Sequence, residues 1–309
     1  MQKKIAQGLL ASALLTMLFT APANAEESLF SYVYTTDLLP QGQKEVEQWL
    51  TQRHAKSRGS YDVWEGRTAI EYGVTDKFQV ALYANYEKAT ANRNNVDGTT
   101  LVPETFADYS YDAGSRFDES RFQGFSFEGI YRILSPYTDP IGLALYVEPT
   151  VGPNLRELES KAIVQKNFLD DRLVFAANLT LAQEMRWMKT DLNGSGEPAS
   201  WDRETDLNLG IGVSYRFAPN WSAGIELEHE REYSSFHLSK KYRTNVATYL
   251  GPNIHYGGKD FFVTATFLTQ VGGGKDYASD AGSSFVVGGR NYADDFEKDR
   301  LRIKAGYYF

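Results

Sequence analysis

The chain has 309 residues, of which 42% are hydrophobic and 23% charged, and this balance excludes a largely disordered protein. Cysteine is absent, which excludes a disulfide framework, a thiolate metal site and a cysteine nucleophile. Acidic residues number 40 against 32 basic ones, for a formal net charge of −8. An acidic protein is a poor partner for nucleic acid, so we expect no nucleic-acid binding.

The N-terminus has the organisation of a secretory signal. Lys3 and Lys4 precede an apolar stretch over residues 9–19, and the small-residue motif Ala23-Asn24-Ala25 follows. A transmembrane anchor is the alternative, but the apolar stretch is short for one and a cleavage motif follows at once. We therefore expect residues 1–25 to be a cleaved signal peptide of a protein exported from a Gram-negative cell.

The remaining chain offers no apolar run long enough for a membrane helix. Its longest uncharged run, residues 244–258, has 15 residues and contains Pro252, whereas a helical span needs about 20 apolar residues. The mature protein is therefore either soluble outside the cytoplasm or a membrane-spanning β-barrel.

Alternation with a period of two residues runs along the mature chain and favours the barrel. Apolar residues occupy every second position over residues 207–217, 78–86, 141–147 and 173–181. Tight turns over residues 75–77, 135–140, 218–220 and 257–260 alternate with long polar stretches over residues 88–120, 188–202, 233–242 and 272–298. Short turns at one end and long loops at the other are typical of an outer-membrane barrel.

We predict an all-β protein, a transmembrane antiparallel up-and-down β-barrel of about twelve strands, with ten or fourteen as alternatives. Each strand has close to the length that a tilted span requires. Residues 1–25 are the signal peptide, residues 26–43 an N-terminal periplasmic segment and residues 44–309 the barrel. The predicted strands cover residues 45–54, 63–74, 78–87, 122–133, 141–151, 157–166, 173–184, 204–217, 221–231, 244–256, 261–271 and 300–309.

Four tight turns predict strand register because each can place apolar residues opposite one another. Tyr72 is expected to face Val80, and Val213 to face Ile225. By the same reasoning, Ile254 is expected to face Val263, and Tyr131 to face Leu143.

The chain ends in Tyr307-Tyr308-Phe309, preceded by apolar residues at every second position. This end resembles the terminal strand of Gram-negative outer-membrane β-barrel proteins. The resemblance implies insertion by the outer-membrane assembly machinery, with Tyr307 and Phe309 as the assembly signal. Two short motifs, Leu39-Pro40-Gln41-Gly42 and residues 71–76, are also similar to segments of poorly characterised barrel families regarded as channels or transporters.

The inward face carries charges of both signs, so the lumen is either wet or cross-linked by ion pairs. Glycines at positions 142, 210, 212, 224 and 251 would keep the wall thin and favour a narrow wet pore. Glu226 and Glu228 face glycines across their hairpin, and they form either a cation-selective strip or a ladder paired with basic residues. The candidate lumen-lining residues are Arg67, Glu71, Glu128, Arg132, Glu148, Glu226, Glu228, Glu230, Arg302 and Lys304.

These features favour a passive outer-membrane channel, or porin, for small solutes. A structural or adhesive barrel is the alternative. A barrel phospholipase or protease is less favoured, because none of the four histidines lies in a motif typical of such enzymes. We expect no catalytic residues, metal or cofactor. The expected partners are outer-membrane lipids and lipopolysaccharide, the assembly machinery and small solutes, and the expected state is a monomer.

Overall fold

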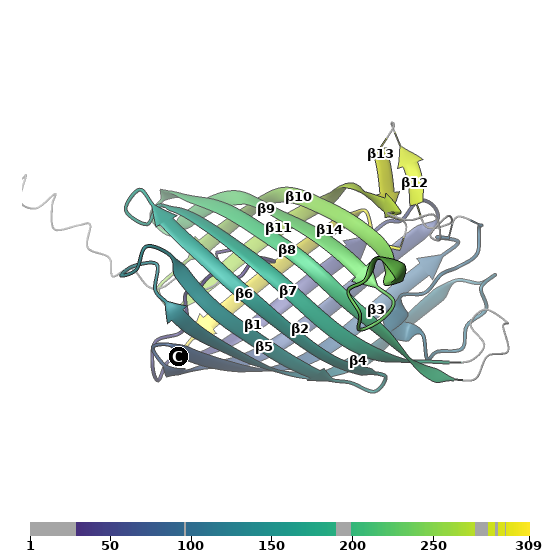
Figure 1. The fold of residues 1–309 in the computed structure, drawn as a ribbon, viewed down its shortest axis with the longest axis horizontal. Coiled ribbons are helices and arrows are strands. Elements are labelled where there is room, and N and C mark those ends of the chain that lie inside the picture. The colour runs from purple at the N-terminus through teal and green to yellow at the C-terminus, as the bar shows by residue number, and fades with distance from the viewer. Residues whose placement is uncertain (1–28, 96, 190–198, 276–283, 288–289, 294) are drawn as a thin grey trace, which may run out of the picture.

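Twelve antiparallel strands close into a single barrel in a computed structural model that describes residues 29–95, 97–189, 199–275, 284–287, 290–293 and 295–309 (Figure 1). Neighbouring strands in the chain pair in the sheet, and β14 closes the barrel between β1 and β11. The predicted fold class and the predicted number of strands are therefore confirmed. The predicted signal peptide lies outside the described residues.

Most barrel strands extend beyond the predicted ones, mainly at the end that carries the long loops, whereas β5 begins one residue later than predicted. Their bounds are β1 Lys44–His54, β2 Ser60–Thr75, β3 Phe78–Asn92, β4 Phe117–Leu134, β5 Gly142–Val151, β6 Leu155–Phe168, β7 Leu173–Met188, β8 Ser200–Ala218, β9 Trp221–Tyr233, β10 Arg243–Gly257, β11 Phe261–Lys275 and β14 Asp299–Tyr308. A separate two-stranded sheet, β12 Ser284–Val287 and β13 Arg290–Ala293, stands beside the barrel mouth (Figure 1). Two short 3₁₀ helices, η1 Glu104–Phe106 and η2 Lys240–Tyr242, lie in the long connections.

Two of the four predicted hairpin registers are correct. Tyr72 pairs with Val80 across the β2–β3 turn, and Val213 pairs with Ile225 across the β8–β9 turn. These turns are the shortest in the barrel, so they leave little freedom in pairing.

The other two registers are displaced by two residues. Ile254 pairs with Ala265 rather than Val263, and Tyr131 pairs with Leu145 rather than Leu143. A displacement of two residues keeps each side chain on its predicted face. The division into inward and outward residues therefore does not depend on this error.

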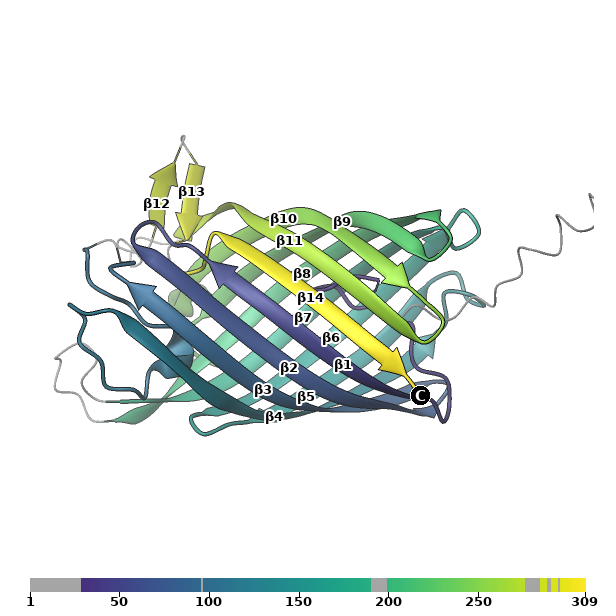
Figure 2. The ribbon, with the colours of Figure 1, turned by 180° about the vertical axis from the view of Figure 1, so that it is seen from behind.

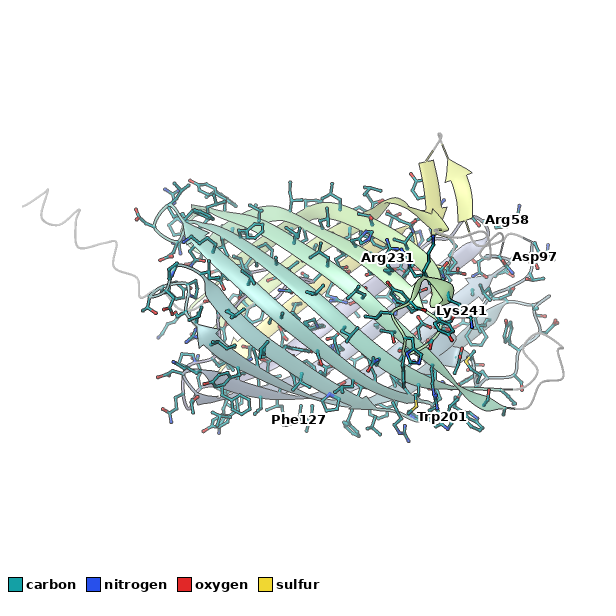
Figure 3. The ribbon with its side chains drawn as sticks, in the orientation of Figure 1. Arg58, Asp97, Phe127, Trp201, Arg231 and Lys241 are labelled. Atoms are coloured by element: carbon teal, nitrogen blue, oxygen red, sulfur yellow. The ribbon has the colours of Figure 1, made fainter. Side chains whose placement is uncertain are left out.

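The outer face of the barrel is apolar and rimmed by aromatic residues. Exposed leucine, isoleucine, valine and phenylalanine side chains cover it, and Phe127 and Trp201 point away from the wall (Figure 3). At the short-turn end, the ring of Tyr256 contacts the rings of both Trp221 and Phe261, and Trp187 packs on Trp201 at the other end. An apolar band between aromatic girdles suits a lipid bilayer. In the described residues, no helix is long and apolar enough to cross a membrane.

The short-turn end carries the C-terminus, as Figure 2 shows. Bacterial barrels place short turns in the periplasm and longer loops outside the cell. We therefore assign this end to the periplasm and the loop-bearing end to the cell exterior.

Candidate functional site: the lumen and its internal segment

Residues 29–39 lie inside the barrel, in the half of the lumen near the periplasmic end; we call them the luminal segment. Figure 2 shows this purple chain within the ring of strands. Every residue of the segment is buried except Tyr34, which is half-buried. This placement departs from the expected periplasmic segment at 26–43, and it has a physical reason. The segment is rich in large apolar side chains, such as Phe30, Val33 and Leu38, which pack against the inner wall instead of facing water.

Glu226 on β9 holds the first turn of the luminal segment. Its carboxylate accepts hydrogen bonds from the backbone N–H groups of Ser31 (3.0 Å), Tyr32 (2.7 Å) and Val33 (3.1 Å). The Nδ2 atom of Asn253 (3.2 Å) and the hydroxyl of Thr266 (2.6 Å) also donate to it. The Glu226 side chain is fully buried. Five donors therefore surround a carboxylate that has left water, which is how a buried charge is stabilised without a cation.

Three side-chain amides hold the rest of the segment through its backbone. Asn178 on β7 accepts from the N–H of Tyr34 (2.6 Å) and donates to its carbonyl (2.9 Å). Gln165 on β6 accepts from the N–H of Thr36 (2.7 Å), and Gln79 on β3 accepts from the N–H of Leu39 (2.7 Å). The segment thus satisfies its backbone groups with side chains from several strands instead of joining the sheet.

Aromatic rings of the segment also contact cationic side chains of the wall. Arg302 lies 4.0 Å from the ring centre of Tyr32, and Lys161 lies 4.7 Å from that of Tyr34. The Tyr34 ring meets Tyr146 edge-on at 5.2 Å. Such contacts add to the hydrogen bonds because cations are attracted to the faces of aromatic rings.

Glycines of the inner wall make room for the segment. A Cβ atom at Gly212 would lie 2.7 Å from the Phe30 ring, and one at Gly142 would lie 2.3 Å from the Thr36 hydroxyl. A Cβ at Gly210 would lie 3.3 Å from Val33. The sequence predicts that such glycines keep the wall of a narrow wet pore thin; in the structure, the space beside Gly142, Gly210 and Gly212 is filled by the luminal segment.

Above the segment lies a cavity of about 840 Å³, which we call the outer cavity. Tyr32 and Tyr34 lie at its inner end, and residues 101–105 and 295–297 line it from the loop side. The connection between β3 and β4 folds inward, where Val102 and Phe106 pack against Tyr61. The lumen is therefore a pocket on the extracellular side that the luminal segment closes toward the periplasm.

The wall of the outer cavity is unevenly charged. Glu157, Glu184 and Glu204 lie opposite one another across β6, β7 and β8, and Asp206 lies opposite Glu232 on β9. Like charges at paired positions repel. In the described part of the chain, Glu204 and Asp206 form no ion pair, so this wall brings acidic side chains together without a basic partner for these two.

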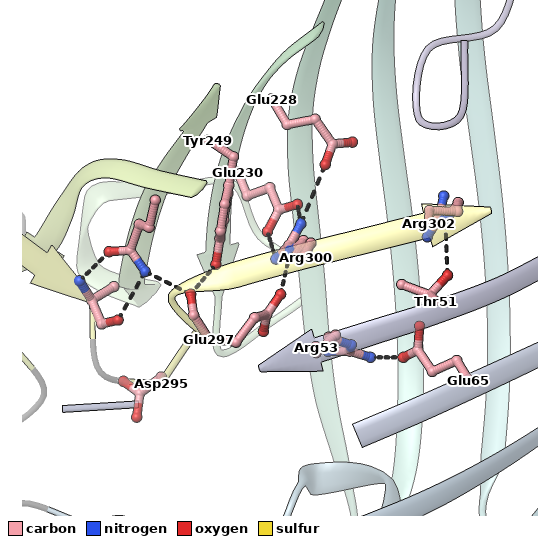
Figure 4. A network of polar contacts seen from close by, with 12 residues as sticks. Thr51, Arg53, Glu65, Glu228, Glu230, Tyr249, Asp295, Glu297, Arg300 and Arg302 are labelled. Carbon is pink, nitrogen blue, oxygen red and sulfur yellow. Dashed lines mark hydrogen bonds and ion pairs between the residues drawn. The ribbon is translucent and has the colours of Figure 1, made fainter. Parts of the chain in front are cut away.

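Most basic side chains that line the outer cavity form ion pairs with acidic ones. Arg300 contacts Glu228, Glu230 and Glu297 and stacks on Tyr249 at 3.9 Å (Figure 4). Burial acts to raise the pKa of Glu297, which lies outside the strands, but Arg300 and then Arg53 hold that pKa below its ordinary value. Acidic side chains outnumber basic ones in the lining of the outer cavity.

All ten candidate lumen-lining residues lie on the inner face, at two levels. The outer cavity is lined by Arg67, Glu148, Glu228, Glu230 and Arg302, and Arg67 pairs with Glu148 at 2.7 Å. The remaining five lie around the luminal segment: Glu71, Glu128, Arg132, Glu226 and Lys304. Lys304 pairs with Glu47 at 3.2 Å. The acidic strip on β9 is therefore divided, with Glu226 committed to the segment and Glu228 and Glu230 to Arg300.

The two residues of the proposed assembly signal lie at the periplasmic end. Tyr307 points outward and is exposed. Phe309 forms paired backbone hydrogen bonds with Lys44 at the start of β1. The last strand therefore closes the barrel, which places Phe309 at its seam.

Two groups of three carboxylates could surround a cation, namely Glu104 with Glu184 and Glu204, and Glu204 with Asp206 and Glu232. Within each group the oxygens lie within 4.8 Å of one another. Hard divalent cations prefer such oxygen ligands. Exposed acidic groups are common without a metal, and we assign none here.

The profile of one family matches residues 22–309 and is described as a family of unknown function (DUF6662). The chain belongs to this family. No curated protein matches it by sequence. Among solved structures, the COG4313 outer membrane channel from Pseudomonas putida F1 is similar with a TM-score of 0.56 and 12% identity, over 89% of this chain and 98% of that chain. The β domain of the Bordetella autotransporter BrkA has a TM-score of 0.50 and 12% identity, over 87% of this chain and 100% of that one.

These likenesses concern the fold, and together with the closed twelve-strand barrel they show that the protein is an outer-membrane β-barrel. The predicted location in the outer membrane is therefore confirmed.

Proposed function

We propose that the protein is a passive channel for small solutes and that the conformation described above is its closed state. One observation carries the proposal: a polar cavity on the extracellular side is separated from the periplasm by residues 29–39. These residues join no strand of the barrel and are held by side-chain contacts. Because the luminal segment is held only in this way, it can leave the lumen without breaking hydrogen bonds between barrel strands, whereas a strand cannot.

The wall beneath the segment is suited to a water-filled path. If the segment leaves, the exposed inner face carries Glu71, Glu128, Glu226 and Lys304 along with the amides of Gln165 and Asn178. Charged and amide groups of this kind are stable when hydrated. Because carboxylates also dominate the outer cavity, we expect the open channel to prefer cations.

A structural or adhesive barrel is the second candidate, and the tight fit of the segment favours it. In that case the segment never leaves, and the large extracellular loops carry the function. We propose no catalytic role. His255 bonds Thr264 at 2.7 Å and His229 bonds Thr248 at 2.9 Å, so these two histidines are held by threonines of the wall.

The two candidates differ in conductance. We would compare the full mature chain with a variant that lacks residues 29–39, both in planar bilayers. Heat-modifiable mobility on gels would verify that both are folded barrels. The channel proposal expects a mostly silent full-length protein and a conducting deletion variant. A folded deletion variant that does not conduct would refute the channel and favour the structural barrel.

We further propose that the protein is a monomer among lipids and lipopolysaccharide and that the outer-membrane assembly machinery inserts it. Size-exclusion chromatography with light scattering in detergent would test the monomer, and a stable dimer mass would refute it.

A further inference from the structure

The lumen recognises the luminal segment mainly through its backbone. Glu226 accepts from three consecutive N–H groups, and Asn178 bonds both the N–H and the carbonyl of Tyr34. Gln165 and Gln79 each accept from one more N–H group of the segment. Every peptide carries the same N–H and C=O groups, so these contacts select for a peptide as a chemical class rather than for this particular sequence.

We infer that the periplasmic half of the lumen is a peptide-binding groove and that residues 29–39 occupy it as an internal ligand. A separate peptide of the same kind can take their place. This inference rests on the proposed function, since it names the class of ligand that the channel binds.

Carbonyl groups of the luminal segment also accept hydrogen bonds from side chains of the wall. The Nη1 atom of Arg302 donates to the carbonyl of Ser31 at 3.3 Å, and Nη1 of Arg132 donates to that of Thr36 at 3.4 Å. The Nδ2 atom of Asn253 donates to the carbonyl of Leu29 at 3.3 Å. The wall therefore presents both acceptors for the N–H groups and donors for the C=O groups of a polypeptide backbone. An oligosaccharide or a lipid offers no such regular series of N–H and C=O groups.

Side-chain contacts add a preference for aromatic residues at alternate positions. Phe30 lies over Gly212, the Tyr32 ring faces Arg302, and the Tyr34 ring packs between Trp49 and Tyr146. Gly212 has no side chain, and the cations and rings tolerate any flat aromatic group. The favoured ligand is therefore a peptide of about the length of the segment, with aromatic residues two positions apart.

The groove can be tested in a variant that lacks residues 29–39. A fluorescein-labelled peptide with the sequence of residues 29–39 would be titrated against this barrel folded in detergent, with anisotropy as the readout. We expect saturable binding. A peptide with alanine at the three aromatic positions should bind at least tenfold more weakly. In bilayers, the unlabelled native peptide should block the current of the deletion variant.

Two substitutions in the deletion variant locate the binding site. Glu226→Gln removes the carboxylate that accepts three backbone N–H groups, and it should weaken peptide binding about tenfold or more. Glu232→Gln changes an acidic residue on the same face of β9 that bonds Asn245 instead, and it should leave binding unchanged.

The outcomes separate this inference from the channel proposal. No saturable binding by a folded barrel would overturn the groove, as would equal affinities of the Glu226→Gln and Glu232→Gln variants. A barrel that binds peptide but conducts no current would refute the channel and leave the groove standing. A barrel that conducts but is not blocked by native peptide would refute the groove alone.

Discussion

Replacing Glu226 by glutamine should release the luminal segment in the full-length protein. The Oε2 atom accepts hydrogen bonds from the backbone N–H groups of Tyr32 and Val33. The Oε1 atom accepts three more, from Ser31, Asn253 and Thr266. An amide has only one acceptor atom, so its NH₂ group must face donors at one of these positions. At the Oε2 position, this removes two charge-assisted hydrogen bonds, each worth about 1.5–3 kcal/mol.

Water that enters beside the NH₂ group would recover part of this loss. We therefore take about 3 kcal/mol as the net change in favour of the open state. Since 1.4 kcal/mol is a factor of ten, the open-to-closed ratio should rise roughly a hundredfold. Mostly silent wild-type channels would become channels with frequent openings.

The assay is the open fraction of single channels in planar bilayers at neutral pH, with Glu232→Gln as the matched control. Limited proteolysis gives a second readout, because released residues 29–39 become cleavable. If Glu226→Gln folds as the wild type does and shows the open fraction and protection of the control, Glu226 does not hold the segment and the reasoning fails.

Three further predictions follow from the same contacts. Gly212→Ala places a methyl group about 2.7 Å from the Phe30 ring of the luminal segment, so it should also raise the open fraction. Gly272→Ala, at a position with open space around it, is the control, and equal open fractions of the two variants would contradict the prediction. Deleting Phe309 removes the backbone pair that closes the barrel at its seam and should sharply lower the yield of heat-modifiable folded protein in cells, whereas an unchanged yield would contradict its role in assembly. In the channel without residues 29–39, changing Glu204 to Gln together with Asp206 to Asn should reduce cation preference, read as reversal potential across a salt gradient. Thermal stability should not fall, because neither side chain forms an ion pair with another residue that the structure describes; an unchanged reversal potential would show that this wall does not face the permeating ions.

The strands were predictable from the sequence because their pattern is local. Alternation separates lipid-facing residues such as Leu209 from luminal ones such as Asn208, and a bilayer enforces that separation at every strand. The tightest turns also fixed register, as at Val213 and Ile225. Longer turns allow more than one pairing with the same faces, which explains the displacement by two residues at Ile254.

The luminal segment was not predictable in the same way. Its contacts join side chains of distant strands to backbone atoms. Almost every residue has the same backbone N–H and C=O groups, so the sequence does not show which of them will be bound. Two signals were present nonetheless. Glu226 faces Gly212 without a cation across its hairpin. Aromatic residues also occupy every second position at 30, 32 and 34, outside all the predicted strands. A buried carboxylate beside glycines indicates that something else must fill the space and supply donors.

The charged lining of the lumen was predicted in part, whereas the outer cavity was not. The mixture of charges along the inner face is visible in the alternation, but its pairing is not. Arg300 gathers Glu228, Glu230 and Glu297 from different parts of the chain, and only the closed barrel brings them together.

The central claim, that residues 29–39 lie within the lumen, can be tested directly by thiol labelling. The chain has no native cysteine, so Ser31→Cys introduces a single thiol at a side chain that is 2% exposed. Ser239→Cys, at an exposed loop position, is the control. A bulky maleimide added to the folded protein in detergent should label the control fully and leave Ser31→Cys unlabelled until the barrel is denatured. Equal labelling of both thiols in the folded protein would contradict the account.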